Sequence, residues 1–148
     1  MTPGAVSPPQ VYAALHGATG GRLFTVTVLD RAAGLARRVY SSDPVAYPVS
    51  GTKPMGQGAW TDQVIDRAEV FVANTVAAFA PYFADHAQIE GLGCGSAMNV
   101  PIVDGQVIGT VNILDQAQYF TPDTVARLRA TIDDHQAALV AAFRAEVV

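Results

Sequence analysis

Residues 91–115 read GLGCGSAMNVPIVDGQVIGTVNILD, and the rest of the chain can be arranged around them. Two apolar runs, residues 97–103 and 106–114, flank the pair Asp104-Gly105. An Asp-Gly pair between alternating hydrophobic residues is the strongest short-range signal for a β-hairpin. The stretch therefore predicts a tight hairpin, preceded by a glycine-rich turn that holds Cys94, the only cysteine.

The chain before this hairpin predicts further strands and short helices. Ser7 followed by two prolines is typical of a helix start, and the β-branched run LFTVTVL is typical of a strand. The elements that we expect are a helix over 10–15, a hairpin of 23–29 with 35–42, a turn of helix over 63–68, a strand over 69–74 and helices over 75–80 and 82–90.

Two segments suggest how a cavity and a contact between copies could arise. Residues 43–60 combine three prolines and three glycines with Tyr47, Met55 and Trp60, which predicts an irregular lid or wall over a cavity; a loop that only packs on the sheet edge is the alternative. Residues 123–146 predict one long amphipathic helix after a Thr-Pro-Asp cap. Its second apolar set is rich in alanine and allows close approach of another copy, so we expect a homodimer through the terminal helices.

These elements predict an α+β domain with a central antiparallel sheet and helices packed on it. At 148 residues the chain fits a single domain, residues 1–148, whose first eight residues we expect to be a flexible tail. Helices gather on one sheet face. The long loop and the short helix are then free to cover the other face and form a pocket.

Composition excludes several classes of protein. The net charge is −4 and no basic stripe is present, so we expect no nucleic-acid partner. No segment approaches a membrane span and the N-terminus lacks the features of a signal peptide, which predicts a cytoplasmic protein with no membrane partner. One cysteine and three scattered histidines form no metal-ligand pattern, so we expect no metal and no cofactor.

The hairpin also carries a family resemblance. Residues 92–102 and 104–114 resemble the second half of GAF domains, and the upstream order of Trp60, residues 71–74 and residues 83–86 leading to Ile89 agrees with it. The resemblance covers about residues 11–143. It implies a GAF-like sheet of about six antiparallel strands flanked by helices, a small-molecule pocket on one side, and in many members a dimer formed by helices.

Subfamily signatures do not narrow the function further, because GAF domains serve many chemistries. Bilin-binding members carry a cysteine followed by histidine, whereas Cys94 is followed by Gly95. The Asn-Lys-Phe-Asp-Glu signature of cyclic-nucleotide-binding members is absent. Free methionine-R-sulfoxide reductases resolve their intermediate with a second thiol, which this chain does not have.

Two residues are candidates for catalysis. Cys94 lies in a Gly-x-Gly turn, where free backbone amides could lower the pKa of its thiol; a small buried hydrophobe is the alternative. His86 could act as an acid or base or bind an acidic ligand. Its neighbour Asp85 points about 100° away on a helix and so cannot form a relay with it; the resemblance implies a structural hydrogen bond for Asp85.

The remaining candidates are ligand-binding residues. Trp60, Tyr82, Phe83, Tyr47 and Tyr40 could form an aromatic wall, with Asn74 and Thr75 at the end of a strand beside them. Ser96 and Asn99 follow the glycine-rich turn, and strand alternation places Asn99 with Ala97 on one face and Ser96 with Met98 on the other. The ligand-binding set that we predict is Tyr47, Trp60, Tyr82, Phe83, Asp85, His86, Cys94, Ser96 and Asn99.

The sequence leaves three functions open. The first is a stand-alone, dimeric GAF-like sensor or ligand-binding protein for a small organic molecule whose identity the sequence does not reveal. The second is an enzyme that has adapted the same pocket, with Cys94 as nucleophile or His86 as acid and base. The third is a partner-binding module whose pocket has collapsed.

Overall fold

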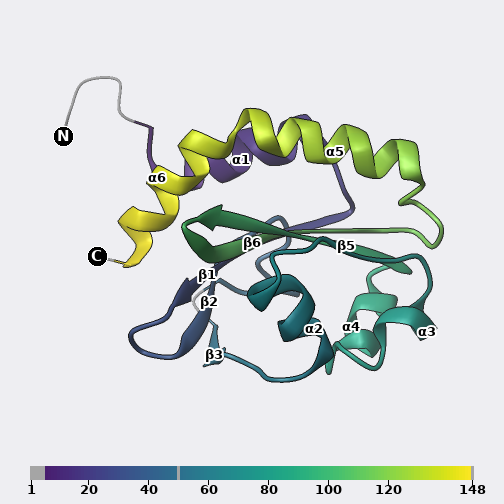
Figure 1. The fold of residues 1–148 in the computed structure, drawn as a ribbon. Helices are drawn as coiled ribbons and strands as arrows, with labels where there is room; N and C mark the ends of the chain where they lie inside the picture. Colours follow the sequence, from purple (N-terminus) through teal and green to yellow (C-terminus); the bar gives the residue numbers. More distant parts are fainter. Residues whose placement is uncertain (1–5, 50, 148) are drawn as a thin grey trace.

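A six-stranded antiparallel sheet forms the middle layer of the protein (Figure 1), as the computed structural model describes it over residues 6–49 and 51–147. The strands lie in the order β3-β2-β1-β6-β5-β4, and every neighbouring pair is antiparallel. The strands are β1 (Leu23–Asp30), β2 (Leu35–Ser41), β3 (Thr52–Pro54), β4 (Phe71–Ala73), β5 (Ser96–Asp104) and β6 (Gln106–Asp115). The expected α+β class is confirmed.

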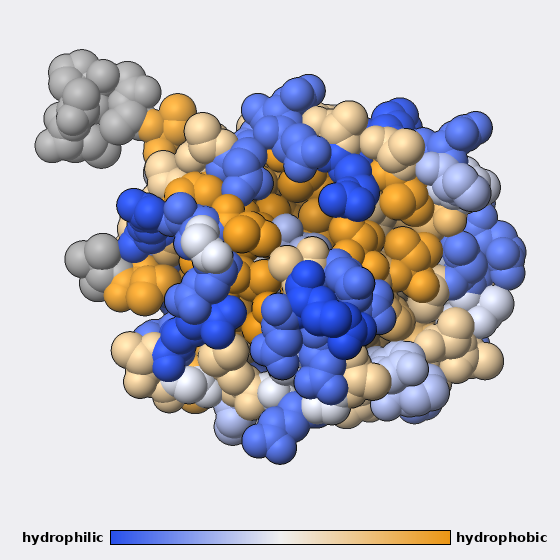
Figure 2. All heavy atoms as spheres, in the orientation of Figure 1, coloured by the Kyte–Doolittle hydropathy of each residue, from blue (hydrophilic) through white to orange (hydrophobic). Residues whose placement is uncertain are grey.

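Helices cover both faces of this sheet. The helices are α1 (Pro8–Thr19), α2 (Ala59–Thr61), the π-helical turn η1 (Asp62–Asp66), α3 (Val76–Phe79), α4 (His86–Gly91), α5 (Pro122–Asp134) and α6 (Gln136–Val147). In Figure 1, α1, α5 and α6 lie on one side of the sheet, and α2, α3 and α4 lie on the other. Figure 2 shows hydrophobic residues between these layers, with hydrophilic residues around them.

The hairpin that the Asp-Gly pair predicts is confirmed. β5 and β6 pair along their whole length, and Gly105 adopts φ 77°, which glycine reaches without the strain that a side chain would bring. β6 pairs with β1 on its other side, so the hairpin supplies the centre of the sheet. Met98, on the helix face, and Asn99, on the opposite face, alternate as predicted.

One side of the sheet is apolar and packs on the three long helices. Phe24, Val26, Val111 and Ile113 point to this side and contact buried residues of the helices, including Leu128 of α5. The terminal chain bends instead of forming one helix over 123–146, because α5 ends at Asp134 and α6 begins at Gln136. Both halves contribute buried residues to the core on this face, Leu128 and Ile132 from α5 and Leu139 and Phe143 from α6.

Several other expected boundaries differ. Helix α1 is longer than predicted and begins with a capping box between Ser7 and Gln10, so residues 7 and 8 do not belong to a tail; positions 1–5 of that tail lie outside the described residues. The helix expected over 82–90 starts only at His86, after a series of turns. The loop over 43–60 contains an edge strand, β3, whose proline is tolerated because the strand pairs on one side only. Within the described residues, no helix has the length and apolar character needed to cross a bilayer.

Candidate functional site

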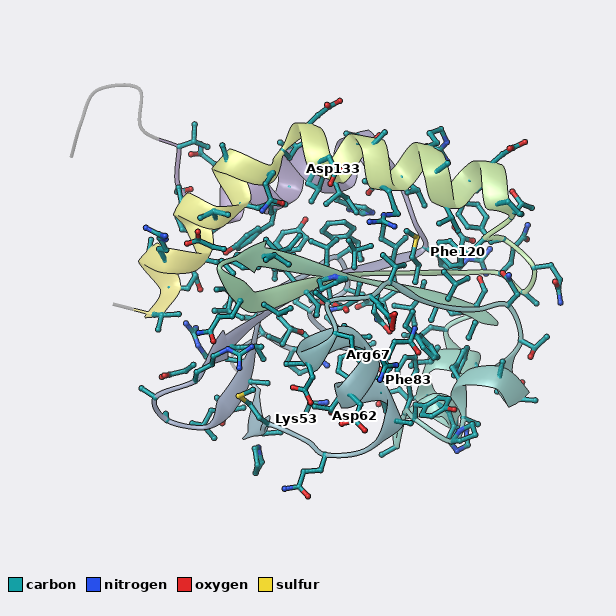
Figure 3. The ribbon with its side chains drawn as sticks, in the orientation of Figure 1. Lys53, Asp62, Arg67, Phe83, Phe120 and Asp133 are labelled. Atoms are coloured by element: carbon teal, nitrogen blue, oxygen red, sulfur yellow. The ribbon has the colours of Figure 1, made fainter. Side chains whose placement is uncertain are left out.

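A cavity of about 500 Å³ lies on the sheet face away from the three long helices. This volume is typical of sites for small organic ligands. Its floor consists of β1, β2, β5 and β6, and its walls come from the long loop, from α2 and from the turns before α4. Figure 3 shows Lys53 and Phe83 on this side of the sheet and Asp133 in the helix layer on the other.

Five polar side chains form the floor, and we call them the polar floor: Thr25, Thr27, Asn99, Thr110 and Asn112. Residues two apart on a strand share a face, which places Thr25 with Thr27 and Thr110 with Asn112. Strand pairing then sets Asn112 opposite both Thr25 and Asn99. All except Thr27 are buried. This face of the strands therefore buries polar side chains, whereas the opposite face of the same strands buries the hydrophobic core.

A chain of hydrogen bonds crosses the polar floor from the loop to β1. The indole nitrogen of Trp60 donates to Asn99 Oδ1 at 3.0 Å, and Asn99 Nδ2 donates to Asn112 Oδ1 at 2.9 Å. Asn112 Nδ2 then donates to Thr25 Oγ1 at 3.2 Å and lies 3.4 Å from Thr27 Oγ1. The chain therefore joins the lid residue Trp60 to three adjacent strands.

Charged and phenolic groups gather at the β2 side of the cavity. Tyr47 donates its hydroxyl proton to Asp85 Oδ2, and the guanidinium of Arg38 lies 4.6 Å from the centroid of the Tyr47 ring. Burial raises the pKa of the Tyr47 phenol above its ordinary value, and the hydrogen bond to Asp85 and the charge of that carboxylate raise it further. Tyr47 thus remains a protonated donor that keeps Asp85 occupied.

A continuous segment of nine residues, 53–61, closes the cavity on the loop side. At one end it is held by the pairing of β3 with β2 and by the hydrogen bond from Met55 N to Gly34 O of 2.9 Å. At the other end it is held by Trp60 on the polar floor. The expected lid or wall is therefore present, and its two ends are anchored to different parts of the sheet.

Six of the nine predicted ligand-binding residues line this cavity: Tyr47, Trp60, Tyr82, Phe83, Asp85 and Asn99. Cys94, His86 and Ser96 are not among the lining residues. Ser96 points away from the cavity and donates to Gln116 O at 2.6 Å, so it anchors the chain after β6. His86 is the first residue of α4 and is half-buried outside the cavity lining.

The surroundings of Cys94 are the opposite of those that a reactive nucleophile requires. The side chain is 1% exposed, and burial raises the pKa of the thiol; the charge of Arg22 lowers it and that of Asp115 raises it. The expected amides are also committed, since Cys94 N donates to Ile89 O and Gly95 N donates to Asp115 O. Without free amides to stabilise a thiolate, Cys94 serves as a small core residue.

Three further wall candidates have structural roles. A β-bulge in β2, opposite Val26 and Thr27 of β1, turns Tyr40 to the helix face, where it packs on Phe24 with ring centroids 5.9 Å apart. Asn74 exchanges two hydrogen bonds with the backbone of Phe120, both of 3.0 Å. Thr75 caps α3 by accepting from Ala78 N.

Sequence reasoning missed four of the five polar-floor residues, namely Thr25, Thr27, Thr110 and Asn112, together with Arg38. A signal for them exists, because LFTVTVL and GTVNIL place a polar residue at every second position of otherwise apolar strands. When a strand is buried on both faces, such alternation indicates that one of the two faces is lined by polar side chains and is not part of the hydrophobic core. The bulge that decides the direction of Arg38 and Tyr40 has no such signal.

Comparison with known proteins agrees with this architecture. The family model described as GAF domain matches residues 11–140. None of the curated proteins compared matches the chain significantly. Among solved structures, the GAF domain of a two-component sensor histidine kinase from Bacillus halodurans is 14% identical with a TM-score of 0.68, and the match covers 93% of this chain and 91% of that one.

A second similar structure is the GAF domain of a phosphoenolpyruvate-protein phosphotransferase from Coxiella burnetii, which is 20% identical with a TM-score of 0.68. The match covers 97% of this chain and 88% of that one. A domain of a two-component sensor histidine kinase protein from Sinorhizobium meliloti is 19% identical with a TM-score of 0.63, over 92% of this chain and 89% of that chain. At these identities the structures establish the fold alone. With the family match, they show that the chain belongs to the GAF domain family.

Proposed function

We propose that this protein is a sensor or binding protein for a small organic molecule, which it holds in the cavity above the polar floor. The observation that carries the proposal is the cavity itself, about 500 Å³ in volume and floored by polar side chains. Thr110 lines it, is 3% exposed as a residue, and makes no side-chain hydrogen bond within the described part of the chain. Among the described residues the Tyr12 hydroxyl is the one fully buried side-chain polar atom without a partner, so the Thr110 hydroxyl keeps contact with the space of the cavity, where water or a ligand can bind it. A partner-binding module with a collapsed pocket has no such space.

The output of such a sensor is a contact with another protein molecule, and we propose a second copy of this chain. The outer surfaces of α1 and α6 carry an exposed set of small residues, which is Ala13, Ala14, Gly17, Ala18, Ala137, Ala138, Ala141 and Ala145. Small side chains let two helices approach closely. The exchange Ala141→Arg is expected to convert a dimer into a monomer in sedimentation equilibrium, and a wild-type protein that is monomeric at high concentration contradicts this part of the proposal.

A thermal-shift screen with a broad panel of small molecules, neutral, cationic and anionic, tests the binding function. A ligand raises the unfolding midpoint by mass action, and the exchange Thr27→Phe, which fills the cavity from β1, should abolish the shift. Val103→Phe is the matched control, because Val103 is exposed on β5 and does not line the cavity. If no compound shifts the midpoint, or if both variants respond alike, the cavity is not the binding site.

No second function is favoured. An enzyme that uses Cys94 or His86 needs these side chains at the ligand, and neither lines the cavity.

A further inference from the structure

The polar floor has a fixed direction of hydrogen-bond donation, and Trp60 sets it. An indole N–H can donate but cannot accept, so the Asn99 atom that faces Trp60 must be its oxygen. Asn99 then presents its nitrogen to Asn112, which must answer with its own oxygen. Asn112 in turn has only its nitrogen left for the threonines of β1.

The consequence falls on the hydroxyl groups at the end of the chain. Thr25 Oγ1 accepts from Asn112 Nδ2, and Thr27 Oγ1 lies within reach of the same nitrogen. A hydroxyl that accepts keeps its own proton free to donate. Within the residues that the structure describes, neither hydroxyl donates to a protein group. Hydrogen bonds in series also polarise one another, which strengthens the last donor in the chain.

A cation stands beside these donors. Thr27 is the direct strand partner of Arg38, and residues that pair across antiparallel strands point to the same face. The guanidinium of Arg38 donates to Pro48 O at 3.2 Å, and among the described acidic side chains none forms a salt bridge with it. Lys53 also lines the cavity, whereas Asp85, the one lining carboxylate among the described residues, is occupied by the Tyr47 hydroxyl.

Apart from Gln57 and Thr61 of the lid segment, most of the remaining lining is apolar or aromatic. It includes Leu23, Leu114, Ile65, Phe83, Met55 and Trp60. A ligand must therefore satisfy hydroxyl and guanidinium donors at one end and cover hydrocarbon surface at the other. A carboxylate has only acceptors and matches an arginine in a bidentate geometry.

From this arrangement we infer that the ligand is an organic carboxylate with an apolar or aromatic body, whose carboxylate lies between Arg38 and the threonine hydroxyls of β1. The inference rests on the proposed binding function and specifies the chemistry of that same site. The apolar body lies against Trp60, so binding also holds the lid segment in place.

Three probes with one skeleton test this inference: 4-phenylbutyrate, 4-phenylbutyramide and 4-phenylbutylamine. Trp60 is the only tryptophan, and its emission, excited where a phenyl ring does not absorb, reports occupancy; calorimetry gives the affinities. The carboxylate should bind roughly tenfold more tightly than the amide, since a charge-assisted hydrogen bond is about twice as strong as a neutral one. The amine should bind most weakly.

Variants separate the charge from the shape of the site. Arg38→Gln should remove roughly tenfold of the carboxylate affinity and leave the amide unchanged. Thr27→Val, which keeps the branched shape and removes the hydroxyl, should also weaken the carboxylate. Arg129→Gln is the matched control, because Arg129 is exposed on α5 in the opposite layer (Figure 1).

Each outcome decides the matter. A carboxylate preference that Arg38→Gln removes and Arg129→Gln keeps supports the inference. Equal or tighter binding of the amide or the amine overturns it while upholding the binding function, and so does a carboxylate preference that Arg38→Gln leaves intact. If none of the three binds and the broad panel finds a ligand without an anionic group, only the inference fails; if the broad panel also finds nothing, both proposals fail.

Discussion

Removing either asparagine of the polar floor should destabilise the protein, and removing both should cost less than the sum. Asn99→Leu deletes the amide between Trp60 and Asn112. Asn112 Oδ1 then loses its partner in a residue that is only 9% exposed. Asn112→Leu likewise leaves Asn99 Nδ2 without its hydrogen-bond partner. In the double variant both partners are replaced by apolar groups of similar size, and neither amide is left alone.

The size of the effect follows from these contacts. A buried polar group without its partner costs about 1–3 kcal/mol, whereas replacing both members of a pair by apolar groups can be nearly neutral. Each single exchange should therefore lower the free energy of unfolding by about 2 kcal/mol. The double exchange should lower it by roughly 1–2 kcal/mol less than the two added together, which is a coupling typical of contacting residues.

Urea unfolding measures this directly. With a slope of about 1–3 kcal/mol per molar, each single exchange should lower the midpoint by roughly 1 M at unchanged slope. Strict additivity of the two exchanges would show that the asparagines do not act through one another. The continuous chain from Trp60 to β1, and the donor direction derived from it, would then be wrong.

Four further exchanges test the packing and the titration of buried groups. A Cβ at Gly109 would lie 2.6 Å from the Phe143 ring, so Gly109→Ala should lower the free energy of unfolding in urea by about 1–3 kcal/mol. Gly17 lies inside α1 with open space around its Cα, so Gly17→Ala should stabilise the protein by about 0.5–1 kcal/mol. The raised pKa of Cys94 means that the folded state holds the thiol proton more tightly than the unfolded state does, so the free energy of unfolding should fall as pH rises above about 8.5. This fall should be smaller in Cys94→Ala. Iodoacetamide should label the thiol of the wild-type protein only in denaturant. Tyr47→Phe should cost about 1.5–3 kcal/mol, because it removes a hydrogen bond to a carboxylate, and a loss below 0.5 kcal/mol would show that the bond is not formed in solution.

The strands and the pocket face were predictable because their signals are local. The Asp-Gly turn and the β-branched runs specify β1, β5 and β6 through backbone preference and period-two alternation. Six predicted site residues line the cavity because the loop aromatics and Asn99 lie on the sheet face opposite α1, α5 and α6. The same alternation could have revealed the threonines of β1.

The rest depends on long-range packing. A bulge in β2 sends Arg38 and Tyr40 to opposite faces, and only the pairing with β1 shows where that bulge lies. Cys94 could not be placed from the sequence because its surroundings come from α4 and from the end of β6, whose carbonyls accept the amides of Cys94 and Gly95. The break between α5 and α6 leaves no mark in the sequence, because the apolar residues on either side of it keep helical spacing.

The indole N–H signal of Trp60 in a nitrogen-15 correlation spectrum tests the central claim most directly, because the chain has only one tryptophan. Addition of 4-phenylbutyrate should shift this signal together with the backbone amides of β1 and β6 that carry the polar floor, and should leave the amides of α5 in place. Shifts confined to the helix layer, or an indole signal that stays unchanged while the probe binds, would contradict the account.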